Sequence, residues 1–329
     1  MKISVIGGSG FIGTRLVGTL VREGHQIAIL DKRESIAYPK LWQRCDVRDS
    51  SRLCELTKGS DVIINLAAEH RDDVKPRSLY DEVNVGGARC VVEAARHNGI
   101  RKVVFTSSVA VYGFAPAGTD ESGALNPFND YGRTKMEAES VYRAWLAEEP
   151  AVRSLTIVRP TVVFGERNRG NVYNLLHQIA GGMFFMVGNG RNRKSMAYVE
   201  NVAAFLSYVL GFETEEYLFN YIDKPDFDMS SLVAEVRSIL GRQAAPKLKI
   251  PYLIAFLGAK VFDVVASATG RQFSISSIRV KKFCAETLFS SSRVEAIGFK
   301  APVALDEGIR RTVNYEFLED HKEDLFFSE

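Results

Sequence analysis

Cysteine and histidine are scarce in this 329-residue chain, and neither residue type is clustered. The four cysteines include no Cys-x-x-Cys pair, and the five histidines lack the spacing of metal ligands. We therefore expect no metal site. We also expect no disulfide framework, which is usual for a protein of a reducing compartment.

Long apolar runs and an excess of one charge are missing as well. No uninterrupted apolar segment approaches the ~20 residues that a membrane-spanning helix needs. The 42 lysines and arginines nearly balance the 40 aspartates and glutamates, which argues against nucleic acid as a partner. Because the chain starts directly with a strand pattern, we expect no signal peptide and a cytoplasmic protein.

The chain opens on a short apolar strand that runs through glycines into a helical pattern. This order predicts a pyrophosphate cradle, in which Gly7 permits a tight turn, Gly10 lets the backbone approach phosphate and Gly13 allows close packing. The first helical residues, Phe11 and Ile12, are expected to present N–H groups and the positive helix end to the anion.

An acidic residue follows at the distance expected for binding a ribose. Asp31 ends the second strand, eighteen residues after the last glycine of the motif, near the ~20 that is typical. Lys32 and Arg33 would suit the 2′-phosphate of NADP, but the Asp31 carboxylate would repel it. The sequence therefore favours NAD. Asp46 and Val47, which follow the third strand, are expected to lie over the adenine.

The fourth strand, residues 61–68, is apolar enough to be buried on both faces. We expect its last residues, Leu66, Ala67 and Ala68, to lie against the cofactor because the two alanines allow a close backbone approach. Glu69 then opens a dense polar run at the edge where open α/β sheets bind ligands. A solvated loop is the alternative interpretation of this run.

A serine and a tyrosine–lysine pair follow the fifth strand. Thr106 and Ser108 lie at the end of that strand, and Tyr131 and Lys135 open a later helix at i and i+4, on one face. Of the 12 tyrosines, only Tyr131 has a lysine four positions on. Strands that alternate with helices in this way predict an α/β, Rossmann-type, doubly wound parallel sheet.

These three residues permit the oxidation of an alcohol. A phenol with its ordinary pKa near ~10 is a poor base at neutral pH. The Lys135 ammonium and a positive nicotinamide ring would both favour the phenolate of Tyr131. Tyr131 would then take the hydroxyl proton, Ser108 would orient the same oxygen, and Lys135 would also hold the nicotinamide ribose.

Together, the glycine motif, Asp31, Ser108, Tyr131 and Lys135 resemble the extended short-chain dehydrogenases/reductases. The resemblance covers essentially the whole chain and includes Pro160 after the sixth strand. It implies an NAD-binding domain over residues 1–165, to which residues 191–222 return. It also implies a smaller C-terminal substrate lobe, mainly residues 166–329.

Four longer stretches are similar to the bacterial 4-epimerases of undecaprenyl-diphospho-N-acetylglucosamine: residues 66–74, 105–113, 159–176 and 277–284. This resemblance implies a diphosphate-linked N-acetylhexosamine as substrate, in O-antigen or other surface polysaccharide synthesis. It also implies a homodimer that forms through the helices near residues 78–98 and 131–149. The substrate contacts that it implies are made by Glu69, Ser108, Val109, Asn171, Lys194 and Arg279.

Two other substrate assignments stay open. One is the same epimerisation on a UDP-linked sugar, and the other is an NAD(P)H-dependent reduction of a nucleotide-4-keto sugar. Sugar 4,6-dehydration is disfavoured because Val109 and Ala110 stand where the resembling dehydratases carry an acid–base pair. A non-catalytic NAD(H) sensor is disfavoured by the intact serine, tyrosine and lysine.

One apolar segment bears on a lipid substrate. Residues 250–268 contain only two charges, Lys260 and Asp263, and begin next to Pro251. They do not have the length or continuity of a membrane span. The more ordinary role of such a helix is packing within the small lobe, and the alternative is peripheral contact with a membrane interface. The basic residues that follow would suit an anionic bilayer surface.

Overall fold

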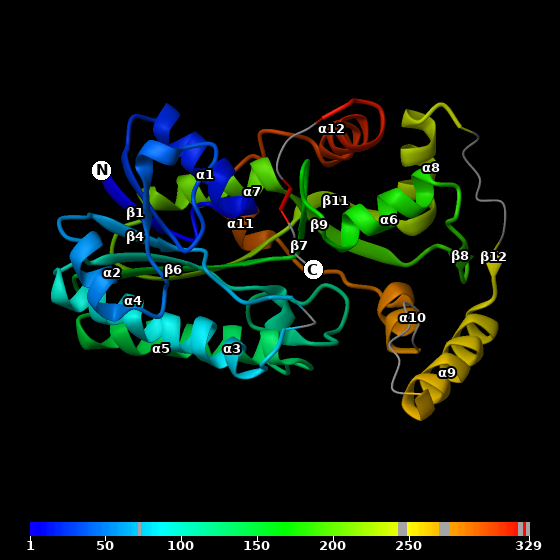
Figure 1. The fold of residues 1–329 in the computed structure, drawn as a ribbon, viewed down its shortest axis with the longest axis horizontal. Helices are drawn as coiled ribbons and strands as arrows, with labels where there is room; N and C mark the ends of the chain where they lie inside the picture. Colours follow the sequence, from blue (N-terminus) through cyan, green and yellow to red (C-terminus); the bar gives the residue numbers. More distant parts are fainter. Residues whose placement is uncertain (72–73, 243–248, 270–276, 322–324, 327–329) are drawn as a thin grey trace.

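The computed structural model describes the chain except for residues 72–73, 243–248, 270–276, 322–324 and 327–329. A seven-stranded sheet with helices on both faces forms one part of the molecule (Figure 1). A second part, built from later elements, lies beside it. No helix of the described residues has the length and apolarity to cross a membrane.

The seven strands of the large sheet are all parallel, in the order β10-β6-β5-β4-β1-β2-β3. This is the doubly wound arrangement that the sequence predicts, with the strand order reversing next to β1. Most of these strands are buried apolar runs, as expected of a sheet covered on both faces. The strands are β1 (Lys2–Ile6), β2 (Gln26–Asp31), β3 (Trp42–Arg44), β4 (Val62–Asn65), β5 (Lys102–Thr106), β6 (Ser154–Pro160) and β10 (Glu215–Tyr221).

Helices cover the sheet because each presents an apolar stripe to it. One face carries α1 (Phe11–Arg22), α7 (Val199–Tyr208) and α11 (Ser292–Ala296). The other carries α2 (Ser50–Leu56), α4 (Gly87–His97) and α5 (Asp130–Glu148). Short 3₁₀ turns complete this part: Pro39–Leu41, η3 (Val109–Tyr112) and Val209–Gly211.

The second part of the molecule has its own apolar core. Its strands form the set β11-β9-β7 and the pair β12-β8. The strands are β7 (Val162–Phe164), β8 (Met186–Val187), β9 (Arg193–Tyr198), β11 (Asp223–Asp228) and β12 (Lys249–Ile250). Its helices are α6 (Asn171–Ala180), α8 (Met229–Ile239), α9 (Tyr252–Thr269), α10 (Ser277–Cys284) and α12 (Leu305–Phe317).

The helix expected near residues 78–98 runs from Ser78 to His97, but it is not a regular α-helix throughout. Between α3 (Ser78–Tyr80) and α4 lies a π-helical turn, η2 (Asp81–Gly86). Its Asn84 side chain donates to Glu69 O at 2.9 Å and accepts from Glu69 N at 2.8 Å. A π turn widens the helix by one residue, and such turns are frequent at functional sites.

A buried ion pair fixes α5 to the sheet. Arg159 of β6 donates two hydrogen bonds to the Glu139 carboxylate, at 2.8 and 2.6 Å, and the Ser107 hydroxyl donates a third at 2.6 Å. Burial opposes ionisation of Glu139, but the guanidinium outweighs it and lowers the pKa of that carboxyl. The other Arg159 nitrogen donates to the Tyr112 hydroxyl at 2.6 Å.

We predict that Glu139→Gln lowers the free energy of unfolding by about 3–5 kcal/mol, because it leaves the buried Arg159 charge unpaired. Urea denaturation measures this change. The matched control is Glu137→Gln on the same helix, whose side chain is 41% exposed in its ion pair with Arg133. The control should change stability by less than about 1 kcal/mol. Equal losses for the two variants would contradict the prediction.

Candidate active site

The glycine turn after β1 leaves no room for side chains. Gly7 has a φ of +78°, and a Cβ there would lie 2.7 Å from Ala67 N. A Cβ on Gly13 would lie 2.5 Å from Gly7 O and 2.6 Å from Gly8 Cα. Gly10 precedes α1 without a side-chain cap, so Phe11 and Ile12 lie in the first turn of a helix that has its positive end at this loop.

Asp31 is joined directly to this turn. Its carboxylate accepts from Ser9 N at 3.1 Å and from Arg33 N at 3.0 Å. Burial raises the pKa of Asp31, while the two backbone donors oppose the rise. The Lys32 side chain, by contrast, is exposed. The carboxylate, rather than a cation, therefore faces the glycine turn.

The structure gives the contacts and burial of the predicted cofactor residues Asp46 and Val47, after β3, and Pro160, at the end of β6. The Asp46 carboxylate accepts two hydrogen bonds from the Arg48 guanidinium, at 3.0 and 2.9 Å, and these lower the pKa of Asp46. The Val47 side chain is buried against Gly87. Pro160 lies buried at the carboxyl end of β6.

The fourth strand ends at Asn65 rather than at residue 68. Leu66 N still donates to Ile6 O at 2.9 Å, but Ala67 N turns to the Asn65 side chain at 3.0 Å. The strand ends here because its neighbour β1 turns away at Gly7. Leu66, Ala67 and Ala68 thus form a bend against the glycine turn instead of an extended strand.

The serine and the tyrosine are brought close because the turn η3 packs against the start of α5. Ser108 caps η3, and its hydroxyl oxygen accepts from Ala110 N at 3.1 Å, which leaves its proton for another acceptor. Gly132 packs on this turn so closely that a Cβ would lie 2.5 Å from Ala110 O. Tyr131, next to Gly132, is held at the start of α5, where Asn129 caps the helix by accepting from Gly132 N.

Lys135 is almost completely buried one turn further along α5. Its Nζ lies 4.4 Å from the centre of the Phe105 ring, on β5. Burial lowers the pKa of Lys135 to about 7, against the Glu139 carboxylate, which raises it. Within the described residues, Nζ has no hydrogen-bond acceptor. A buried ammonium of this kind needs one, and a ligand hydroxyl is a fitting partner.

The polar run after β4 lies beside Tyr131. The His70 ring meets the Tyr131 ring edge-on, with centroids 6.5 Å apart, and burial lowers the His70 pKa. The Glu69 backbone is held by Asn84, whose amide also donates to Thr134 at 2.9 Å. The His70 ring and the Glu69 backbone are therefore held by neighbouring residues, unlike those of a solvated loop. Asp72 and Asp73 lie outside the described residues.

The predicted substrate residues are divided between the two parts of the molecule. Val109 is the first residue of η3, beside Ser108, whereas Asn171 opens α6 with an exposed side chain. Lys194 of β9 donates to Ala285 O at 2.6 Å, and burial lowers its pKa to about 8. Arg279 lies on α10, and its side chain is outside the described part of the chain.

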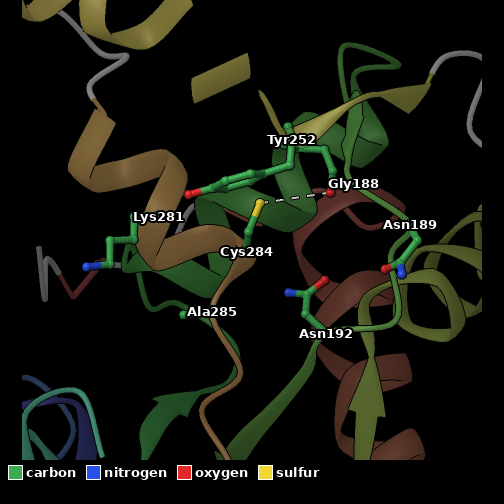
Figure 2. A pocket seen from close by; sticks show the side chains of 8 residues that line it. Gly188, Asn189, Asn192, Tyr252, Lys281, Cys284 and Ala285 are labelled. Carbon is green, nitrogen blue, oxygen red and sulfur yellow. Dashed lines mark hydrogen bonds between the residues drawn. The ribbon is translucent and has the colours of Figure 1, made fainter. Parts of the chain in front are cut away.

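Beside Lys194 is a hollow of about 490 Å³. Figure 2 shows Lys281 on one side of it and Asn189 and Asn192 on the other. The Lys281 ammonium lies 5.1 Å from the centre of the Phe114 ring, and Phe114 stacks on Phe128, just before α5. The hollow is therefore linked to the loop between Ser108 and Tyr131. It is lined by Val187, Gly188, Asn189, Asn192, Tyr252, Lys281, Cys284 and Ala285.

The model of the NAD dependent epimerase/dehydratase family matches residues 3–219. The chain belongs to this family. It is 50% identical, over 99% of its length and 98% of the relative's, to the N-acetyl-alpha-D-glucosaminyl-diphospho-ditrans,octacis-undecaprenol 4-epimerase of Escherichia coli O157:H7.

Solved structures of the family share the fold. The UDP-glucose 4-epimerase of Thermotoga maritima, solved with UDP-glucose, superposes with a TM-score of 0.76 at 20% identity, covering 97% of this chain and 100% of that one. The UDP-glucuronic acid 4-epimerase of Bacillus cereus, solved with NAD, gives 0.75 at 19% identity, covering 96% and 98%. The expected Rossmann-type fold of an extended short-chain dehydrogenase/reductase is thereby confirmed.

The described residues fit the NAD of this epimerase/dehydratase family. The glycine turn approaches its neighbours too closely for side chains, as a pyrophosphate cradle requires. Two buried hydroxyl oxygens, Ser9 Oγ and Thr106 Oγ1, have no hydrogen-bond partner within the described structure. Bound NAD would supply partners for such groups and for Lys135. No group of three His, Cys, Asp or Glu among the described residues is arranged to hold a metal.

Two residues of this epimerase/dehydratase site escape the sequence reasoning. Glu139 shares the helix face of Tyr131 and Lys135, at four-residue intervals, and a carboxylate beside a buried lysine is a readable signal. Asn84 gives no such signal, because its role depends on a π turn that no spacing rule reveals.

We predict that Gly13→Ala weakens NAD binding about tenfold or more, because overpacking of this kind typically costs about 1–3 kcal/mol. Calorimetric titration with NAD measures the affinity, and far-ultraviolet circular dichroism checks the fold. Gly211→Ala is the matched control, since a Cβ there meets nothing within 4 Å. An unchanged affinity in Gly13→Ala would overturn the cradle assignment.

We also predict that NAD affinity falls as the pH rises through Lys135's pKa of about 7, because the ammonium form, populated below that pKa, is a stronger hydrogen-bond donor to a ribose hydroxyl than the neutral amine. Lys135→Met should bind weakly, with no such pH dependence. Lys102→Met is the control. Its ammonium donates to Leu210 O, at the amino end of β5, far along the strand from the site. A pH dependence that persists in Lys135→Met would refute the assignment.

Proposed function

We propose that this protein is an NAD-dependent 4-epimerase that interconverts N-acetylglucosamine and N-acetylgalactosamine on a polyprenyl diphosphate carrier. The observation that carries the proposal is the 50% identity, over nearly the full length of both chains, with the E. coli O157:H7 enzyme that acts on such a lipid-linked sugar. The placement of Ser108, Tyr131 and Lys135 supports it. The pathway served would be O-antigen or other surface polysaccharide synthesis.

The proton chemistry falls to three side chains. Tyr131 accepts the proton of the sugar C4 hydroxyl, and Ser108 donates a hydrogen bond to the same oxygen. Two features of α5 favour the phenolate that this step requires. Tyr131 lies in the first helical turn, where the helix dipole is positive, and the Lys135 ammonium follows one turn later.

The cycle is redox-neutral. NAD⁺, when bound, would accept the hydride from C4, and the NADH so formed would give the hydride back. The 4-keto sugar must present its opposite face before the return, while Tyr131 gives the proton back. Something must hold the substrate while the sugar ring turns. We assign this task to the diphosphate and to the hollow beside Lys194, with Asn171, Arg279 and Glu69 as further contacts.

The proposal assigns a role to each domain of the chain. Residues 1–165 would bind NAD, and 166–329 would mainly bind substrate. Of the segment 191–222, which is expected to return to the NAD-binding domain, α7 and β10 do so, whereas β9 pairs within the second part of the molecule. A homodimer would form through α4 and α5, which lie side by side on one face of the sheet. We place the enzyme at the cytoplasmic face of the inner membrane, where lipid-linked substrate would be met.

Product analysis tests the proposal. We expect the purified protein, with catalytic amounts of NAD, to convert polyprenyl-diphospho-N-acetylglucosamine to a mixture with the galacto epimer. UDP-N-acetylglucosamine, offered side by side, should react far more slowly. Tyr131→Phe should lose about 10²–10⁴-fold in rate, the usual contribution of general base catalysis, while retaining NAD.

Two results would redirect the assignment. Faster turnover of the UDP-linked sugar would make the protein a nucleotide-sugar epimerase. A change in NADH absorbance in proportion to product would make it a 4-keto-sugar reductase.

A further inference from the structure

Among the described residues, several exposed large apolar side chains lie on helix α9. Leu253, Ile254, Leu257 and Val261 are 64%, 63%, 55% and 63% exposed. In Figure 1, α9 projects from the second part of the molecule, beside α10. The sequence-based preference for a helix packed within the small lobe is therefore wrong for this face.

The exposed residues share one side of the helix. Leu253, Leu257 and Val261 recur at four-residue intervals, and Ile254 adjoins them. The opposite side contains Ala259, which is 1% exposed. Asp263 accepts from the Ser277 backbone N–H, which ties α9 to the start of α10. The helix is thus anchored by one side, and its apolar side is turned outward.

The sequence around this helix is strongly one-sided in charge. Residues 242–285 carry eight lysines and arginines and a single acid, Asp263, whereas the whole chain is nearly balanced. Among the described residues, the side chains of Lys249, Lys260 and Lys281 are exposed. An apolar helix face bordered by cations suits the boundary between acyl chains and anionic headgroups.

We propose that the apolar face of α9 docks on an anionic lipid bilayer. A second copy of this chain is the weaker fit, because a two-fold interface would place this basic segment against itself. A bilayer rich in anionic lipid offers the opposite charge together with an apolar interior for the leucines.

This docking connects to the hollow beside Lys194. Tyr252, the first residue of α9, and Lys281 of α10 both line the hollow. Lys281 also lies over Phe114, on the loop between Ser108 and Tyr131. This step rests on the proposed function: the polyprenyl tail of the substrate would remain in the bilayer while its diphosphate enters the hollow.

Vesicle co-sedimentation, without sugar substrate, tests the docking. We expect the NAD-loaded full chain to sediment with phosphatidylcholine vesicles that contain phosphatidylglycerol, and less with phosphatidylcholine alone or at high salt. The double variant Leu253→Gln/Leu257→Gln should bind at least about tenfold more weakly, from lost apolar burial. Ile36→Gln, a change at a 67% exposed apolar residue elsewhere, should bind like the unaltered protein.

Three results would overturn the docking: an unaltered protein that stays in the supernatant, a double variant that sediments as fully as the unaltered protein, or a double variant that dissociates a dimer in size-exclusion chromatography. Epimerisation of a short, water-soluble prenyl-diphosphate sugar separates the two proposals. If the unaltered protein catalyses that reaction but does not bind the anionic vesicles, only the docking is lost. If vesicle binding holds but the reaction is absent, only the proposed function is lost.

Discussion

The ion pair between Glu139 and Arg159 is the contact on which the rest of the site depends. It lies in the dry space between α5 and the sheet, where neither charge could persist alone. Through Ser107 and Tyr112, the same pair reaches the end of β5 and the turn η3. The turn that carries Ser108 and the helix that carries Tyr131 are thereby held in one frame.

That frame explains how a lysine can be buried beside a tyrosine. Lys135 lies one turn from Glu139 on α5, over the Phe105 ring, so a carboxylate and an aromatic face both support its charge. Desolvation nevertheless lowers the pKa of Lys135, so the nitrogen loses its proton more easily until a ligand offers a hydrogen-bond acceptor. We propose that cofactor binding and activation of the Tyr131 phenol are coupled in this way, through the Lys135 nitrogen.

The sequence predicts much of this arrangement, because period and spacing determine it. The glycine turn, Asp31 and the Tyr131–Lys135 pair each follow a local rule that connects residue type to chemistry. The π turn at Asn84 and the exposure of α9 escape prediction for a different reason. Both depend on which distant segment packs against a helix, and an apolar pattern alone cannot tell a buried helix from one that faces outward.

The central claim, that Tyr131 ionises readily because Lys135 and the helix start favour its phenolate, is tested most directly by ultraviolet difference titration of tyrosinate in the NAD-bound protein. We predict one tyrosine that titrates clearly below the ordinary pKa of ~10 and is missing from Tyr131→Phe. The same titration should move upward in Lys135→Met. Identical titration curves for the unaltered protein and Tyr131→Phe below that pH would contradict the account.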